Sequence, residues 1–247
     1  MKGWVTVDTL VLPKMGQDPT QCEDAVAVRT TERAVVVAVA DGATEAAYSR
    51  AWAQELVQAA SNLEEAGKLV EAVRQAQVPF STRLEASQTD LPWYVAQKAQ
   101  QGAYAALLRL RVKKHIDLDA GEEIGRGGAW HAEAVGDVTL FHLRASRLLR
   151  AWPNALPSDF GTRPDLIHSG AAGSLDRVQQ LHGAWQPGDS LCLGTDAIAA
   201  HLLAGADRAV RFAARPRGDW ATVIGKARAE GMKNDDVAFV RLTFEQP

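Results

Sequence analysis

Residues 25–42 read AVAVRTTERAVVVAVADG, and this stretch decides the fold. It predicts two β-strands, AVAVR at 25–29 and AVVVAVA at 34–40, joined by a polar turn at 30–33. The second strand is apolar on both faces, which is typical of a central strand covered on both sides of its sheet. It runs directly into Asp41-Gly42, so an acidic side chain stands where the strand ends.

Helices are predicted on the C-terminal side of these strands. Tyr48, Trp52 and Leu56 recur every four residues, which is the stripe of an amphipathic helix over 45–60 and favours core packing for these three side chains. A second helix is predicted over 63–77.

A third helix is predicted over 91–110, with Asp90 as its N-cap and Pro92 in its first turn. Four basic residues near its end then suit the negative end of a helix dipole. They are Arg109, Arg111, Lys113 and Lys114.

The chain then returns to strands. Strands are predicted at 130–135, 138–143, 147–152, 190–194 and 237–242. Residues 153–188 are polar and contain prolines, so irregular loops are expected there, and short helices are expected at 197–203 and 220–230. Helices segregated from hairpin-connected strands indicate an α+β fold with mostly antiparallel sheets, in a single domain over residues 1–247.

Composition excludes several classes of protein. The chain has 247 residues, 47% of them hydrophobic, with 27 basic and 30 acidic side chains, so it lacks the basic excess of a general nucleic-acid binder. The longest purely apolar run, 34–40, is far shorter than the roughly 20 residues of a membrane span. Cys22 and Cys192 are too few for a disulfide framework. No apolar signal region follows Met1, so we expect a cytoplasmic protein that binds neither nucleic acid nor membrane.

Acidic residues recur at the edges of the predicted strands. They are Glu23, Asp24, Asp41, Asp137, Asp196, Asp235 and Asp236. Any one of them fits a turn residue or a helix N-cap. Converging together, they would repel one another unless divalent cations neutralised them, and oxygen ligands without clustered His or Cys favour Mg²⁺ or Mn²⁺ over zinc.

Five segments carry a resemblance to a known family. They are QCEDAVAV (21–28), VVVAVADGATE (35–45), AEAVGDVTLFHLR (132–144), PGDSLCLGTDAIA (187–199) and NDDVAFVRL (234–242). In this order they resemble the metal-dependent protein phosphatase 2C (PPM) family, over nearly the whole chain and with the spacing of a minimal bacterial-type catalytic domain. The resemblance implies an αββα four-layer sandwich of two antiparallel sheets between helices.

The resemblance also implies a role for each acidic residue around two Mn²⁺ or Mg²⁺ ions. Asp41 would bridge the two ions, and Asp196 and Asp235 would complete the protein ligands of one. The backbone carbonyl of Gly42 would bind the other ion. Glu23 and Asp24 would hold metal-bound waters. Asp137 would share a third, weaker metal site with Asp196.

The activity implied is hydrolysis of phosphomonoesters by attack of a water that bridges the two ions. The substrate implied is phosphoserine or phosphothreonine in a protein, opposing a Ser/Thr kinase of the same cell. Two alternatives stay open. One is a pseudophosphatase or phosphoprotein-binding regulatory module with little turnover, and the other is hydrolysis of a small phosphorylated metabolite.

Four positions depart from the family pattern and concern the substrate. Pro19 stands where an arginine usually holds the phosphate, and Lys14 and Arg126 are its candidate replacements, although each also fits a solvated surface cation. Ala43 replaces a histidine found in part of the family, Ala197 replaces a glycine, and Glu45 places a carboxylate where glycine is usual. Glu45 suits the first turn of a helix, and it would repel a phosphate if it faced the metals.

Overall fold

Two antiparallel β-sheets form the centre of the molecule. The structure is a computed structural model, and it describes residues 4–43, 48–87, 102–114, 127–161, 164–170, 175, 177–205 and 207–245. One sheet has five strands in the order β1-β11-β10-β6-β7. The other has six, in the order β2-β3-β4-β5-β9 with β8 paired to β4.

The strands of each sheet come from distant parts of the sequence. The five-stranded sheet contains β1 (Val5–Leu12), β6 (Thr139–Arg144), β7 (Arg147–Trp152), β10 (Ser190–Gly194) and β11 (Val237–Phe244). The six-stranded sheet contains β2 (Ala25–Thr30), β3 (Ala34–Gly42), β4 (Tyr104–Lys114), β5 (Gly128–Val135), β8 (Ile167–His168) and β9 (Gln179–Trp185).

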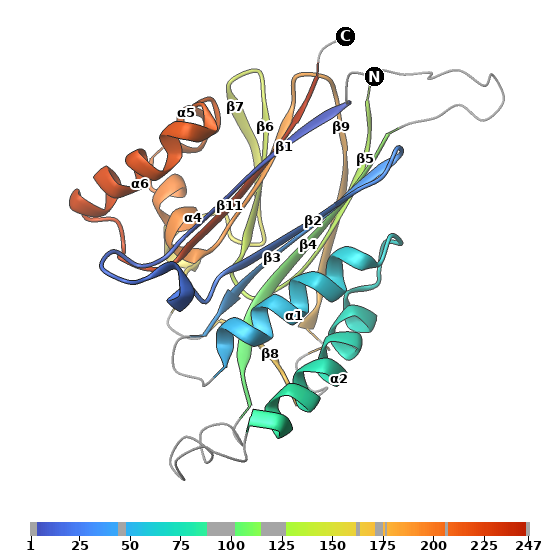
Figure 1. The fold of residues 1–247 in the computed structure, drawn as a ribbon. Coiled ribbons are helices and arrows are strands. Elements are labelled where there is room, and N and C mark those ends of the chain that lie inside the picture. The colour runs from blue at the N-terminus through green and yellow to red at the C-terminus, as the bar shows by residue number, and fades with distance from the viewer. Residues whose placement is uncertain are drawn as a thin grey trace, which may run out of the picture.

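Helices cover the outer faces of both sheets (Figure 1). The six-stranded sheet packs against α1 (Ser49–Asn62) and α2 (Leu69–Ser87). The five-stranded sheet packs against α4 (Asp196–Leu203), α5 (Arg208–Ala213) and α6 (Trp220–Ala229). Short 3₁₀ turns are η1 (Pro19–Gln21), η3 (Pro157–Asp159) and η5 (Arg217–Asp219). The four layers confirm the predicted αββα sandwich.

Strand β3 shows why a run of small apolar residues suits the centre of this sandwich. Val35, Val37 and Val39 face the second sheet, where they join the core between the two sheets. Ala38 and Ala40 face the other way and leave room for α1 to pack closely. Successive side chains of a strand point to opposite faces, so alternation of Val and Ala fills both layers.

The third predicted helix is wrong over the part that the structure describes. Residues 104–110 lie in β4, paired with β3 on one side and β5 on the other. The run ALLRLRV at 106–112 is apolar enough to suit either a buried strand or a helix, and periodicity alone does not separate the two. Asp90, Pro92 and the rest of 91–101 lie outside the described residues.

The remaining differences concern strands, one short helix and the bounds of α2, which covers 69–87 and not the predicted 63–77. The predicted loop at 153–188 contains β8 and β9, and β9 pairs with β5 over seven residues. Its sequence QQLHGAW is largely exposed along the sheet edge, so it lacks an apolar signature. Strand β1 and helix α5 are additional elements that the sequence patterns did not indicate.

No helix among the described residues is long and apolar enough to cross a lipid bilayer.

A buried ion pair ties the helical layer to the six-stranded sheet. Arg109 of β4 and Glu133 of β5 have side chains that are 0% and 1% exposed, and Nη1 of the arginine lies 2.7 Å from Oε2 of the glutamate. Arg109 therefore sits in a strand, and the prediction that its basic run ends a helix is wrong.

The same two side chains bind the ends of both covering helices. Arg109 donates to the carbonyl oxygens of Ala60, Leu63 and Glu65 at and beyond the end of α1. The other oxygen of Glu133 accepts from the backbone N–H of Leu69, 3.0 Å away, at the start of α2. Helix ends leave backbone groups without hydrogen-bond partners. The Arg109–Glu133 pair supplies such partners to the end of α1, to the start of α2 and to the segment between them.

The ion pair leads to a stability prediction. Arg109→Met removes the cation and leaves Glu133 buried without its charge partner, so the free energy of unfolding is expected to fall by about 3–5 kcal/mol. Denaturant titration followed by circular dichroism measures this change. Arg147→Met, at an exposed arginine of β7, is the matched control and is expected to leave stability nearly unchanged. Equal effects of the two substitutions would contradict the structural role given to the pair.

Candidate active site

The register of the strands brings the predicted acidic residues to one end of the sandwich. The start of β2 pairs with the end of β3, so Asp24 and Asp41 come together. The end of β10 pairs with the start of β11, which brings Asp196 beside the segment that carries Asp235. Asp137 lies in the turn between β5 and β6. Five separate segments thus contribute a carboxylate to the same region.

These carboxylates repel one another strongly. Burial and the charges of four neighbouring aspartates, Asp24 first, raise the pKa of Asp41 well above its ordinary value. Burial likewise raises the pKa of Asp24, against a hydrogen bond from Thr195, and the charges of neighbouring aspartates add to the effect. Burial and the charge of Asp196 raise the pKa of Asp137 to about 6. Asp41 accepts no hydrogen bond from the residues that the structure describes, so its charge has no partner among them.

Thr195 fixes the orientation of Asp24. Its hydroxyl group donates to Oδ2 of Asp24 at 2.8 Å, and the hydroxyl oxygen, Oγ1 of Thr195, accepts from the backbone N–H of Ala238 at 3.0 Å. Thr195 is fully buried. The hydroxyl therefore connects the carboxylate that precedes β2 with the first residues of β11.

Asp236 and Asn234 hold the loop that leads into η1. Asp236 is 4% exposed, and its two oxygens accept from the backbone N–H groups of Lys14 and Glu23, both at 2.8 Å. The side chain of Asn234 accepts from the N–H of Met15 at 2.7 Å. Of the two adjacent aspartates, Asp236 is thus engaged in backbone contacts, whereas Asp235 points toward the acidic cluster and its lysines.

Two lysines stand among the carboxylates. Nζ of Lys233 lies 2.8 Å from Oδ2 of Asp196 and 2.7 Å from Oδ2 of Asp235. Nζ of Lys14 lies 3.1 Å from Oδ1 of Asp235 and 3.9 Å from Oε2 of Glu23. Burial opposes ionisation of Asp235, but the hydrogen bonds from Lys233 and Lys14 lower its pKa. Lys14 is 17% exposed and is engaged with the cluster, so the solvated-cation interpretation of this residue is wrong.

The donor set fits hard divalent cations in its chemistry. The site offers several carboxylate oxygens, and the Asp41 carboxylate lacks a partner in the described protein. As the side chains stand, no three His, Cys, Asp or Glu among the described residues are grouped closely enough to hold one ion. Lys233 joins Asp196 to Asp235, so those carboxylates must turn away from the lysine to meet a cation.

Gly42 is required by the packing of the site itself. A Cβ at this position would lie 2.9 Å from the backbone oxygen of Glu23 and 3.1 Å from the Glu23 Cβ. A glycine therefore lets the end of β3 approach the Glu23-Asp24 segment closely.

Other predicted residues have mixed outcomes. Pro19 opens η1, and Asp18 caps that turn. Cys22 is 4% exposed, and burial raises the pKa of its thiol to about 12, so the thiol stays protonated and serves as a small buried side chain. Glu45 and Arg126 lie outside the described residues.

Several side chains of the site were missed by the sequence patterns. Thr195 is fully buried, and its place directly before the predicted ligand Asp196 is the sequence signal that could have found it. Lys233 precedes the acidic segment by one residue and looked like an ordinary surface cation. Arg50, in the first turn of α1, reaches the site only because α1 packs across β2 and β3.

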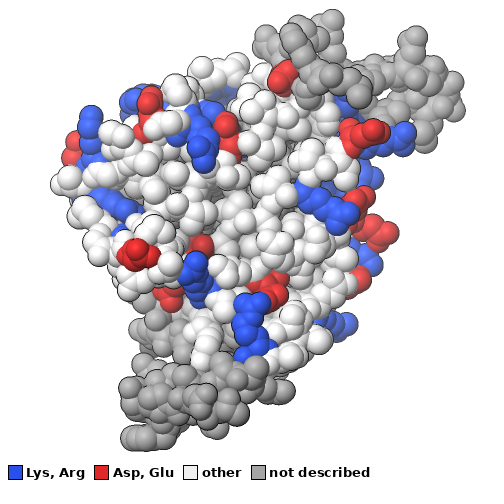
Figure 2. Space-filling view, viewed as in Figure 1, with Lys and Arg blue, Asp and Glu red and all other residues white. Residues whose placement is uncertain are grey.

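The face shown in Figure 2 carries charges of both signs. In the part of that face that the structure describes, Lys and Arg side chains alternate with Asp and Glu, and neither sign forms an extended field.

Comparisons with known proteins agree with the fold described above. Residues 16–115 match the family model described as protein phosphatase 2C. The structure of the Mycobacterium tuberculosis serine/threonine phosphatase PstP/Ppp has a TM-score of 0.63 and 13% identity, covering 98% of this chain and 99% of that one. The catalytic domain of PstP in complex with two manganese ions has a TM-score of 0.61 and 14% identity, covering 98% and 99%. The Staphylococcus aureus serine/threonine phosphatase Stp1 has a TM-score of 0.64 and 9% identity, covering 98% and 96%. A search of curated proteins finds no match.

The raised pKa values predict how stability depends on pH without metal. Asp137 titrates near 3.8 when unfolded and at about 6 when folded. Between these values the folded state binds more protons, so the free energy of unfolding falls as pH rises. In EDTA, the melting temperature is expected to be higher at about pH 5 than at about pH 7.5.

Asp137→Asn is expected to make this dependence less steep, because one of the groups that release a proton is gone. Asp219→Asn, at an exposed aspartate that makes no side-chain hydrogen bond with the described residues, is the control and is expected to keep the slope of the parent protein. A melting temperature that rises across this pH range would argue against the repulsive cluster.

Proposed function

We propose that this chain, which matches the protein phosphatase 2C family model over residues 16–115 and shares the fold of serine/threonine phosphatases, is a divalent-cation-dependent hydrolase of phosphoserine and phosphothreonine in proteins. The single observation that supports this most is the Asp41 carboxylate, which is repelled by four aspartates and has no hydrogen-bond donor among the described residues. A carboxylate in that setting is neutralised either by a proton or by a bound cation, and the other oxygen ligands around it favour the cation.

The proposal assigns a role to each acidic residue of the cluster. Asp41 faces two cations, Mn²⁺ or Mg²⁺, and Asp196 and Asp235 complete the protein ligands of one, while the Gly42 carbonyl serves the other. When bound, the cations supply a water of lowered pKa for in-line attack on phosphorus and neutralise charge on the phosphoryl oxygens.

The residues around the proposed cation ligands fix the positions of neighbouring groups. Thr195 holds the Asp24 carboxylate in one direction, and Asp236 fixes the backbone of Glu23. We assign Glu23 and Asp24 to waters around the cations, and Asp137 to a third, weaker cation shared with Asp196. Carboxylates bind cations without forming a covalent phosphoenzyme, so we expect direct transfer of the phosphoryl group to water.

The proposed substrate is a phosphorylated protein, which a Ser/Thr kinase of the same cell supplies. The support is that the chain covers nearly the whole length of serine/threonine phosphatases with the same fold.

The first experiment measures hydrolysis of para-nitrophenyl phosphate and of a mixed phosphopeptide pool in Mn²⁺. Asp41→Asn is expected to lower turnover by about 10²–10³-fold, the loss typical of removing one electrostatic group from a catalytic site. EDTA is expected to abolish turnover, and Asp219→Asn is expected to retain it. Turnover that survives both EDTA and Asp41→Asn would refute a cation-dependent mechanism at this cluster.

A regulatory module with little turnover is the second candidate, and the two lysines favour it. Lys14 and Lys233 already neutralise part of the cluster, as ion pairs with Asp235 and Asp196 show. A folded protein that binds a phosphopeptide but does not hydrolyse any member of the pool would support this candidate over the enzyme.

Lys233 gives a separate prediction about metal affinity. Its ammonium group must leave Asp196 and Asp235 before these carboxylates meet a cation, so Lys233→Ala is expected to strengthen Mn²⁺ binding severalfold. Isothermal titration calorimetry measures the affinity. Lys226→Ala, at an exposed lysine of α6, is the matched control and is expected to change nothing. Weaker Mn²⁺ binding in Lys233→Ala would show that the lysine supports the site rather than competing for it.

A further inference from the structure

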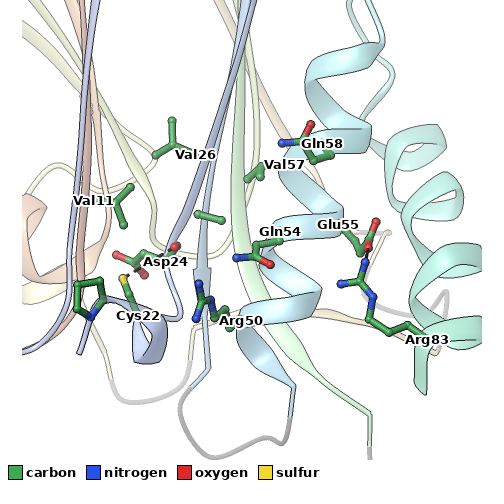
Figure 3. Close-up of a pocket in the computed structure, with 12 residues that line it drawn as sticks. Val11, Cys22, Asp24, Val26, Arg50, Gln54, Glu55, Val57, Gln58 and Arg83 are labelled. Carbon is green, nitrogen blue, oxygen red and sulfur yellow. Dashed lines mark hydrogen bonds and ion pairs between the residues drawn. The ribbon is translucent and has the colours of Figure 1, made fainter. Parts of the chain in front are cut away.

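A cavity of about 490 Å³ adjoins the acidic cluster (Figure 3). It lies between the β1–β2 side of the sandwich and α1, and its wall includes Pro19, Cys22, Asp24, Arg50 and Gln54. Asp24 belongs to both the cavity and the cluster, because it lines the cavity, accepts from Thr195 beside Asp196, and lies where the start of β2 meets the end of β3. A ligand in the cavity would therefore lie next to the proposed cation site.

Helix α1 presents one polar face to this cavity. Arg50, Gln54 and Gln58 are four residues apart, so they lie along one side of the helix, and all three line the cavity. Trp52 and Leu56 are fully buried on the opposite side. The indole N–H of Trp52 donates to the carbonyl oxygen of Ile167 at 3.0 Å, which fixes the helix and hence the position of Arg50.

The two arginines of the cavity differ in their partners. Nη2 of Arg83 lies 2.7 Å from Oε1 of Glu55, so its charge is neutralised within the wall. Arg50 makes no hydrogen bond and no ion pair with the described residues. Figure 3 shows its guanidinium directed from α1 toward Cys22 and Asp24. The cavity thus contains one arginine whose donors are available to a ligand.

The chemistry of that arginine points to an anion with several oxygens. A guanidinium group is planar and offers parallel N–H donors that match two oxygens of a phosphate. Lys14 and Lys233, the two lysines near the cluster, are already bound to Asp235. The geometry points to Arg50 as the residue that binds the phosphoryl oxygens of the substrate, in the cavity beside Asp24; this assignment rests on the proposed function.

The neighbouring carboxylates set a condition on this binding. Asp24 faces the same cavity, and a phosphate dianion would be repelled by it and by the rest of the cluster. Phosphate binding by Arg50 is therefore expected only after divalent cations have neutralised the cluster.

The test measures binding of inorganic phosphate to the Mn²⁺-loaded protein by isothermal titration calorimetry. Arg50→Ala is expected to weaken phosphate binding at least about tenfold and to raise KM for para-nitrophenyl phosphate, with Mn²⁺ affinity unchanged. Arg50→Lys is expected to be intermediate, because an ammonium group keeps the charge but loses the planar fork. Arg83→Ala, which removes an arginine of the same cavity that is already paired, is expected to leave phosphate affinity unchanged.

The outcomes separate this inference from the proposed function. Wild-type affinity for phosphate in a folded Arg50→Ala protein overturns the role of Arg50, even if phosphopeptides are hydrolysed. Failure of the Mn²⁺-loaded wild type to bind phosphate also overturns it. Loss of phosphate binding in Arg50→Ala, with partial retention in Arg50→Lys, supports the role even if no variant shows turnover, and in that case only the proposed hydrolysis fails.

Discussion

Repulsion among carboxylates at one end of the β-sandwich is the constraint around which this part of the molecule is built. Asp24 and Asp41 are brought together by the pairing of β2 with β3, and Asp196 and Asp235 by the pairing of β10 with β11. Neither sheet pairing allows these groups to separate. The protein offsets the repulsion only in part, through Thr195 on Asp24 and lysines on Asp196 and Asp235. The repulsion that is not offset favours the binding of cations at this end of the sandwich.

The two sides of the site differ in origin. The acidic side is formed by strand ends, whose mutual positions follow from backbone hydrogen bonds. The anion-binding side that we assign to Arg50 is formed by a helix, whose position depends on side-chain packing of Trp52 and Leu56. We therefore expect backbone hydrogen bonds to place the cation ligands precisely. Side-chain packing is expected to place the phosphate contact less precisely. The carboxylates can therefore stay in place while a phosphate contact comes from a different element of the fold.

Sequence patterns predicted the fold class and the acidic side of the site well, for physical reasons. A run such as AVVVAVA has few other uses than a strand covered on both faces, and an aspartate at each strand end is visible in the sequence. The patterns failed where long-range contacts decide. Strand β4 looked helical because its apolar residues satisfy either period, and β9 is an edge strand with an exposed, polar sequence. Arg50 lies 26 residues from Asp24 (50 minus 24), and only the packing of α1 reveals that they share a cavity.

The pair of Arg109 and Glu133 has a consequence for how the site can move. It holds the last turn of α1 to β4 and the first turn of α2 through Glu133 of β5, so both helices are attached to the six-stranded sheet by hydrogen bonds in a buried setting. Helix α1, which carries Arg50, and strand β3, which carries Asp41, are therefore attached to the same sheet. A shift of one sheet against the other would move Asp196 and Asp235, on the side of the five-stranded sheet, relative to Arg50 and Asp41 on the other side.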